Sequence, residues 1–216
     1  QQLASAVAGN HAFIGHQASA GAHRVLYVAG EGDLEELQER GQHMGMRLPV
    51  PADRLYYWPL PTYPLNTPRG FQHLLEMAEL ARPQLTIIDP IYALMSGSMK
   101  DDDRAGDFVR NMNAYQYRTG SAVVLIHHAH RPIRTKDGEL VDEGDSAYYG
   151  SVVWAAWPKS LWLLVQDGPD KHHVTLSCMT YRRSSKLGRT PLMMAEPQPL
   201  LFVQRSALSP TAAVVL

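Results

Sequence analysis

Short apolar runs alternate with amphipathic segments in the first part of the chain, and this alternation constrains the fold more than any other feature. The runs VLYVA, LTII and VVLI are rich in β-branched residues and end at glycine or a polar side chain, which is typical of buried strands. Between the first two runs, LEELQERGQHMG and RGFQHLLEMAELA repeat apolar residues at the helical period. Strands that alternate with helices form a parallel sheet with crossover helices, so we predict an α/β fold.

Other segments extend this pattern toward both ends of the chain. QQLASAVAGN has the composition of a helix that ends at the stop signal Gly-Asn, and LEELQERGQHMG should end near Gly41 or Gly45. We also expect a strand at RLYYWPLP and a helix at DRAGDFVRNMNAYQYRTG. From about Ser160 the pattern changes to strands joined by turn residues, which predicts an antiparallel flank. We expect residues 1–216 to form a single domain.

Composition limits the classes of partner. The chain has 216 residues, 45% of them hydrophobic, which is enough for a sizeable core. Its formal charge is −1 and its pI is near 6.9, so nucleic acid, a membrane surface or an acidic ligand would have to be bound by a local patch. A single cysteine, Cys178, excludes an internal disulfide, and no run of about 18 apolar residues is present. We expect a soluble, cytoplasmic protein without a membrane-spanning segment.

Polar residues follow directly after several of the apolar runs. Glu31 follows VLYVAG, Asp89 follows LTII, and His127 and His128 follow VVLI. In an open parallel sheet, ligands bind beyond the carboxyl ends of the strands, so these side chains are candidates for one site. Two acids and a histidine at one sheet edge can orient a hydrated metal ion, activate a water molecule and contact a phosphate. The combination predicts a nucleoside triphosphatase.

Each candidate also has a structural alternative. Asp89 could be the N-cap of the helix that follows it, and Glu31 could be a first-turn acid, with Asp33 the better cap candidate at that position. The histidine pair could be structural. A zinc hydrolase is disfavoured, because the HH pairs lack the i,i+4 helical spacing of a two-histidine zinc site.

An ordered series of segments resembles the RecA-fold hexameric ATPases of the plasmid RepA replicative-helicase type. The segments are QQLASAVAGN, VLYVAGEGD, LTIIDP, VVLIHHAHRP, YYGS and LSCMTYRRSS. The resemblance implies an α/β, RecA-like P-loop NTPase core, with a mainly parallel sheet flanked by helices and an antiparallel C-terminal flank. It also implies ATP and Mg²⁺ as cofactors.

The resemblance further implies roles for individual residues. Asp89 looks like the Walker B acid, which holds Mg²⁺ through water, and Glu31 looks like the base that orients the attacking water. His128, or less closely His127, looks like the residue that senses the terminal phosphate. Asp89, His127 and Glu31 would therefore all face the bound nucleotide.

In hexameric relatives a cationic side chain reaches the nucleotide of the neighbouring subunit. Lys159, in GSVVWAAWPKS, falls where the family places this arginine finger. A lysine is a point charge rather than a planar fork, which weakens its match. Arg182 and Arg183, in TYRRSSK, are the second pair of candidates for contact with the nucleotide.

The family's phosphate-binding motif, G-x-x-x-x-G-K-[ST], is missing from the sequence. QQLASAVAGN resembles the second half of the helix that follows this loop, so we expect the loop and the first strand just before Gln1 in a complete form. On this interpretation the complete protein hydrolyses ATP, and the chain as given does not bind ATP normally. The alternative is a non-catalytic RecA-like module that binds DNA or a partner.

Two long polar loops are candidates for contact with nucleic acid. SGSMKDDDRAG is mostly acidic, whereas HRPIRTKDGELVDEGDSAYYG carries basic and aromatic side chains, namely His130, Arg131, Arg134, Lys136, Tyr148 and Tyr149. The acids from Glu139 to Asp145 dilute this patch, so a solvated loop is the alternative. With the resemblance, these features predict an ATP-driven motor of replicative-helicase type that acts on single-stranded DNA as a ring homo-oligomer, and the resemblance implies a hexameric ring.

Overall fold

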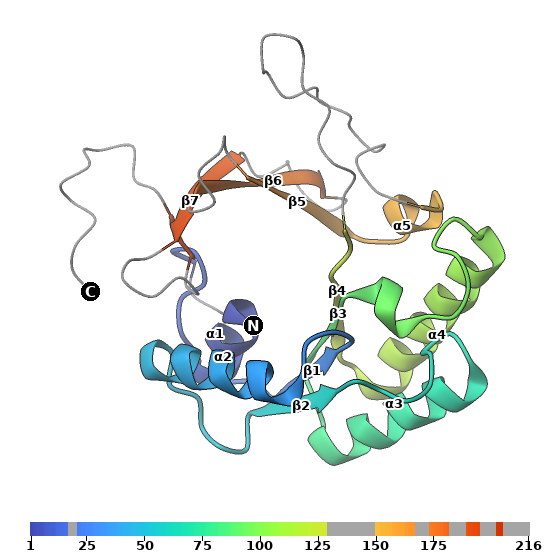
Figure 1. Ribbon diagram of the computed structural model, residues 1–216, viewed down its shortest axis with the longest axis horizontal. Coiled ribbons are helices and arrows are strands. Elements are labelled where there is room, and N and C mark those ends of the chain that lie inside the picture. The colour runs from blue at the N-terminus through green and yellow to red at the C-terminus, as the bar shows by residue number, and fades with distance from the viewer. Residues whose placement is uncertain (17–20, 129–149, 167–172, 182–188, 195–201, 205–216) are drawn as a thin grey trace, which may run out of the picture. The chain divides into compact units, whose positions relative to one another are not determined.

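The computed structural model of the chain describes residues 1–16, 21–128, 150–166, 173–181, 189–194 and 202–204 (Figure 1). The chain divides into two compact units. One comprises Gln1–Phe13 and Gln17–Pro158, and the other comprises Ile14–His16 and Lys159–Leu216. The first unit contains a parallel sheet, and the second contains an antiparallel sheet.

The sheet of the first unit has four strands in the order β2-β1-β3-β4. In the chain these are β1 (Val25–Ala29), β2 (Leu55–Pro59), β3 (Leu85–Asp89) and β4 (Ala122–Leu125). All three pairs of neighbours are parallel, and β1 lies between β2 and β3. The predicted parallel sheet is confirmed, and all four carboxyl ends meet at one edge of it.

Helices cover both faces of this sheet (Figure 1). α1 (Gln2–Gly9) and α2 (Leu34–Arg47) contribute to one hydrophobic cluster, and α3 (Pro68–Ala81) and α4 (Asp102–Thr119) contribute to the other. A helix lies in each crossover between consecutive strands, as the sequence pattern predicts.

Side-chain alternation along the strands decides which residues face which helices. Leu26 and Ile88 pack with α3 and α4, whereas Tyr27 and Ile87 pack with α1 and α2. Because successive side chains of a strand point to opposite faces, Asp89 shares the α1–α2 face with Ile87. The last residue of β3 therefore carries a carboxylate on the side of the sheet where α1 lies.

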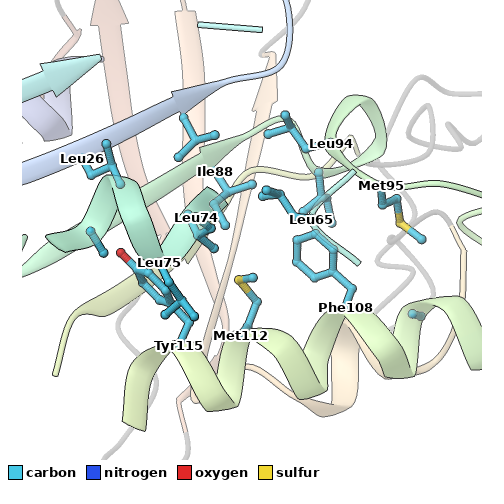
Figure 2. Packing of buried hydrophobic residues seen from close by; sticks show 14 of the residues in the cluster. Leu26, Leu65, Leu74, Leu75, Ile88, Leu94, Met95, Phe108, Met112 and Tyr115 are labelled. Atoms are coloured by element: carbon cyan, nitrogen blue, oxygen red, sulfur yellow. The ribbon is translucent and has the colours of Figure 1, made fainter. Parts of the chain in front are cut away.

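The core between the sheet and α4 is apolar and fully buried. Phe108, Met112 and Tyr115 lie along one face of α4 and point toward Leu74 of α3 and Ile88 of β3 (Figure 2). Their spacing of four and three residues is that of one helical face. This packing holds α4 against the sheet and keeps the strand ends in register.

α2 begins where the sequence predicts and ends later. Asp33 is its N-cap, and its carboxylate accepts a hydrogen bond of 2.7 Å from the backbone N–H of Glu36. The helix continues through Gly41 and ends at Arg47, two residues after Gly45, so the predicted end near Gly41 is wrong and the alternative near Gly45 is close. Met44, which is 4% exposed, anchors the last turn in the core, and its burial outweighs the intrinsic cost of about 1 kcal/mol for each helical glycine.

Two short helical segments were not anticipated from the sequence. They are η1 (Ile91–Leu94), directly after β3, and α5 (Val153–Ala156). Both add buried side chains to the α3–α4 core, including Leu94 and Trp154. One helical turn is too short for a period of 3.6 residues to be recognised in a sequence.

The second unit contains a four-stranded antiparallel sheet in the order β5-β6-β7-β8. Its strands are β5 (Ser160–Gln166), β6 (His173–Tyr181), β7 (Arg189–Met194) and β8 (Phe202–Gln204). The predicted antiparallel flank is confirmed. Within the described ranges, no helix is both long and apolar enough to cross a membrane.

Candidate functional site

The carboxyl edge of the parallel sheet brings most of the predicted site residues together. Ala29, two residues before Glu31, pairs with Asp89, and the backbone N–H of Gly30 donates to the Asp89 carbonyl at 2.7 Å. On the other side of β3, Ile88 pairs with Leu125, which precedes the two histidines by two residues. Both predicted acids and the histidine pair thus follow three neighbouring strands.

Asp89 is half-buried, and its carboxylate accepts a hydrogen bond from the phenol of Tyr27 on the neighbouring strand. Burial raises the pKa of Tyr27, and the adjacent Asp89 carboxylate raises it further, so this phenol stays a proton donor. Asp89 does not cap the next helix, because the N-cap residue of η1 is Pro90 and the start of η1 has no side-chain capping hydrogen bond. The alternative interpretation of Asp89 as an N-cap is wrong.

The side chain of Arg40 in α2 lies near the Tyr27–Asp89 pair, because its guanidinium opposes the rise in the Tyr27 pKa. A guanidinium beside a carboxylate suits a phosphate that is bound together with a cation.

Two buried polar atoms in this region have no hydrogen-bond partner among the described residues. They are Nε2 of Gln1 and the hydroxyl oxygen of Tyr57, whose ring lies 5.5 Å from the ring of Tyr27. Buried polar groups are nearly always paired in proteins, with water or a ligand where protein groups do not serve. A water or a ligand could therefore pair with these atoms.

Glu31 is exposed and lies between the end of β1 and the N-cap of α2. It is not in the first turn of α2, whose acids are Glu35 and Glu36, so the first-turn alternative for Glu31 is wrong. The preceding Gly30 is tightly enclosed, since a Cβ there would lie 2.8 Å from Cγ of Leu94. The loop that carries Glu31 is thus held against η1, while the carboxylate itself remains accessible.

The two histidines diverge at the end of β4. The His127 ring lies 5.9 Å from Trp154, in the direction of the α3–α4 core, whereas the exposed His128 lies 5.1 Å from the ring of Tyr92 in η1. Their opposite directions follow from the period of two in an extended chain. Of the two, His128 is the one that solvent or a ligand can reach.

Of the predicted trans-acting cations, Lys159 is the one that the structure describes. Lys159 is exposed and belongs to the second unit, directly before β5. Arg182 and Arg183 lie outside the described residues, as do the basic and aromatic residues of the loop at 129–149. Their predicted roles stay predictions.

Sequence reasoning missed Tyr27 and Arg40 as neighbours of the site. Tyr27 stands two residues before the end of β1, so its position on the face of Asp89 follows from strand alternation once the register is known. Arg40 also pairs with Glu36 one turn earlier on α2, which made it look like an ordinary surface ion pair. Neither residue has a signal of its own in the sequence.

The described residues contain no group of three or more His, Cys, Asp or Glu side chains that could hold a metal ion. Asp89 by itself is nevertheless a suitable donor for Mg²⁺, which keeps several of its waters and takes further ligands from substrate phosphates. The site chemistry therefore fits a magnesium ion that arrives with a nucleotide, bound through one carboxylate.

Comparisons with known proteins agree with this geometry. A family model described as AAA domain (AAA_25) matches residues 1–132, which include Glu31, Asp89 and both histidines. The fold is similar to a solved structure of a KaiC-like protein from the hyperthermophilic archaeon Pyrococcus horikoshii OT3, with a TM-score of 0.56 and 11% sequence identity over 85% of this chain and 76% of that chain. The search of curated proteins gives no match.

Proposed function

Because this chain belongs to the AAA domain family of P-loop nucleoside triphosphatases, we propose that in the natural protein its carboxyl-edge site takes part in binding ATP with Mg²⁺ and in hydrolysing the terminal phosphate. The observation that carries this proposal is the pairing of Ala29 with Asp89, which sets the loop of Glu31 beside the end of β3. An acid for the metal and an acid for the attacking water are two of the parts that phosphoryl transfer needs.

Each residue of this edge has a distinct task in the proposed reaction. When bound, Mg²⁺ supplies positive charge that neutralises the phosphate oxygens. The Asp89 carboxylate would hold that ion through its waters, and the Tyr27 phenol fixes the orientation of the carboxylate. Glu31 accepts a hydrogen bond from the attacking water and aligns it with the terminal phosphorus. His128 donates a hydrogen bond to a terminal phosphate oxygen. Most of the rate enhancement comes from positioning and charge.

The proposal extends to a motor of replicative-helicase type that works as a ring on single-stranded DNA. Its support is the resemblance of the ordered segments from QQLASAVAGN to LSCMTYRRSS. In such a ring, Lys159, Arg182 or Arg183 of one subunit would reach the nucleotide of the next. The loop at 129–149, with its arginines and tyrosines, would contact the DNA.

A second candidate function is a non-catalytic RecA-like module that binds DNA or a partner. The observation in its favour is that no G-x-x-x-x-G-K-[ST] motif occurs in these 216 residues. The two candidates differ in one property, which is nucleotide turnover by the natural protein.

Steady-state ATP hydrolysis by the natural protein and its Glu31→Gln variant, with and without single-stranded DNA, tests the proposal. Loss of the water-orienting carboxylate should lower turnover about 10²–10⁴-fold and leave nucleotide binding intact. Glu35→Gln is the matched control, because Glu35 is also exposed and lies four residues further along, in the first turn of α2. Absence of ATP hydrolysis by the natural protein would favour the non-catalytic module. A rate of hydrolysis that single-stranded DNA leaves unchanged would contradict the proposed DNA motor.

A further inference from the structure

The amino edge of the parallel sheet, opposite the proposed nucleotide site, contains a hollow of about 620 Å³ with three arginines in its wall. Arg24 directly precedes β1, Arg82 ends α3, and Arg118 lies in the last turn of α4. The remaining wall residues are Ala78, Glu79, Pro83, Gln84, Thr119 and Gly120. Glu79 is the single acid among them, so the wall carries a net positive charge.

The arginine side chains are nearly unused by the protein itself. Nε of Arg24 donates to the Arg82 carbonyl at 3.2 Å, which is a helix C-terminal contact. The guanidinium groups of Arg82 and Arg118 make no hydrogen bond or ion pair with any residue that the structure describes. Glu79 likewise forms no ion pair with any of the three. Most of the charged donors therefore point at solvent around one concave surface.

The other polar groups of the wall are already satisfied, so they hold its shape. Oε1 of Gln84 accepts from the backbone N–H of Arg24 at 2.7 Å, and the hydroxyl of Thr119 donates to the Tyr115 carbonyl at 2.7 Å. The N–H of Gly120 donates to the Gln116 carbonyl at 2.9 Å. These hydrogen bonds hold the backbone around the hollow, and they leave the guanidinium groups of Arg82 and Arg118 to bind an anion.

Arg82 ends α3 with φ 46° and ψ 55°, the left-handed conformation that commonly ends a helix.

From this geometry we infer that the amino-edge hollow is a second, metal-independent binding site for the phosphate groups of a small phosphorylated molecule. Guanidinium groups match phosphate oxygens in pairs of parallel hydrogen bonds, which makes phosphate the anion that three arginines recognise best. The volume lies within the range of small-molecule sites. A nucleic acid strand would instead require a groove of positive charge that continues beyond the hollow.

Calorimetric titration of the natural protein with inorganic pyrophosphate, in buffer with EDTA and no Mg²⁺, tests this inference. The double variant Arg82→Gln/Arg118→Gln should weaken pyrophosphate binding at least about 10-fold, because charge-assisted hydrogen bonds are lost. Glu79→Gln should strengthen it about 2–3-fold, since a like charge next to the ligand is removed. Circular dichroism confirms that each variant is folded.

Arg110→Gln is the matched control, because Arg110 is an exposed arginine on α4 that pairs with Asp107 and does not line the hollow. Equal losses in this control and in the double variant would show diffuse attraction and overturn the inference. Loss of pyrophosphate binding in Asp89→Asn would place the ligand at the carboxyl edge and overturn it as well. The inference would also be overturned if binding of a deoxythymidine oligonucleotide required Arg82 and Arg118 while binding of pyrophosphate did not.

Discussion

The two edges of the parallel sheet carry opposite charges, and each edge complements the helix ends that meet it. At the carboxyl edge, Asp89 ends β3 and Glu31 lies just before α2 begins, and a helix N-terminus favours negative charge. At the amino edge, Arg82 and Arg118 lie where α3 and α4 end, and a helix C-terminus favours positive charge. In the two proposals, the carboxyl edge binds phosphate together with a cation, and the amino edge binds it without one.

Asp89→Asn should separate the two edges most strongly. Loss of the metal-side carboxylate should lower ATP turnover by about 10²–10³-fold, the size of a lost transition-state electrostatic contact. Pyrophosphate binding without metal should be unchanged in the same variant. Asp107→Asn, which removes an exposed acid of α4, is the control for both assays. A variant that loses both activities would show that the edges are not independent.

Tyr27→Phe should have a smaller effect at the carboxyl edge. The variant keeps the packing of the ring and removes the hydrogen bond to Asp89, so turnover should fall about 10-fold, as for other partners that orient a metal-binding side chain. The apparent affinity for Mg²⁺ in the turnover assay should weaken in parallel. Tyr117→Phe, at a position that is 92% exposed, is the matched control. Turnover equal to that of the control would exclude an orienting role for Tyr27.

The loop after β1 contains one acid with a structural role and one with a proposed chemical role. Asp33→Ala removes the cap of α2 and should lower the free energy of unfolding by about 1 kcal/mol. Glu31→Gln should leave the unfolding midpoint unchanged, because this exposed side chain caps no helix. Urea denaturation of both variants measures the difference. A lower unfolding midpoint in Glu31→Gln would contradict this division of roles between Asp33 and Glu31, because lost turnover could then reflect lost stability.

Beneath the amino edge, Tyr115 should make stability depend on pH. Burial raises the pKa of its phenol, which bonds to Thr86 at 2.7 Å, so the folded state holds a proton that the unfolded state releases near pH 10. This contribution to stability is complete below pH 10 and is lost as the pH rises further. The stability lost in this way amounts to less than about 1 kcal/mol at pH 10.5.

Thermal unfolding at pH 8 to 10.5 measures this dependence. Tyr115→Phe should make the decline in stability above pH 10 shallower, whereas the exposed Tyr117→Phe should leave it as in the natural protein. An equal change in both variants would contradict the assignment of the effect to burial of Tyr115.

The sequence predicted the carboxyl edge better than the amino edge, for a physical reason. Apolar runs that stop at Glu31 and Asp89 indicate where strands end, and parallel strands bring those ends together. The site could therefore be proposed from the sequence alone. Arg24, Arg82 and Arg118 are separated by long stretches of chain and each looks like an ordinary helix-end or surface cation. Only their meeting at one hollow makes them a candidate site.

The errors of prediction have a similar origin. Gly41 looked like a possible helix end, but the burial of Met44 keeps α2 intact to Arg47. The bond between Tyr27 and Asp89 was hidden because it depends on the register of two strands 62 residues apart. Local signals specify where elements begin, and tertiary contacts decide where some of them end and which side chains meet.

The central claim is that the carboxyl edge binds a nucleotide together with a divalent cation through Asp89. Electron paramagnetic resonance of Mn²⁺, added with a non-hydrolysable ATP analogue to the natural protein, reports directly on that cation. The account predicts a bound Mn²⁺ signal that appears only with the nucleotide, is lost in Asp89→Asn and persists in Asp107→Asn. A nucleotide-dependent signal of undiminished strength in Asp89→Asn would contradict the account.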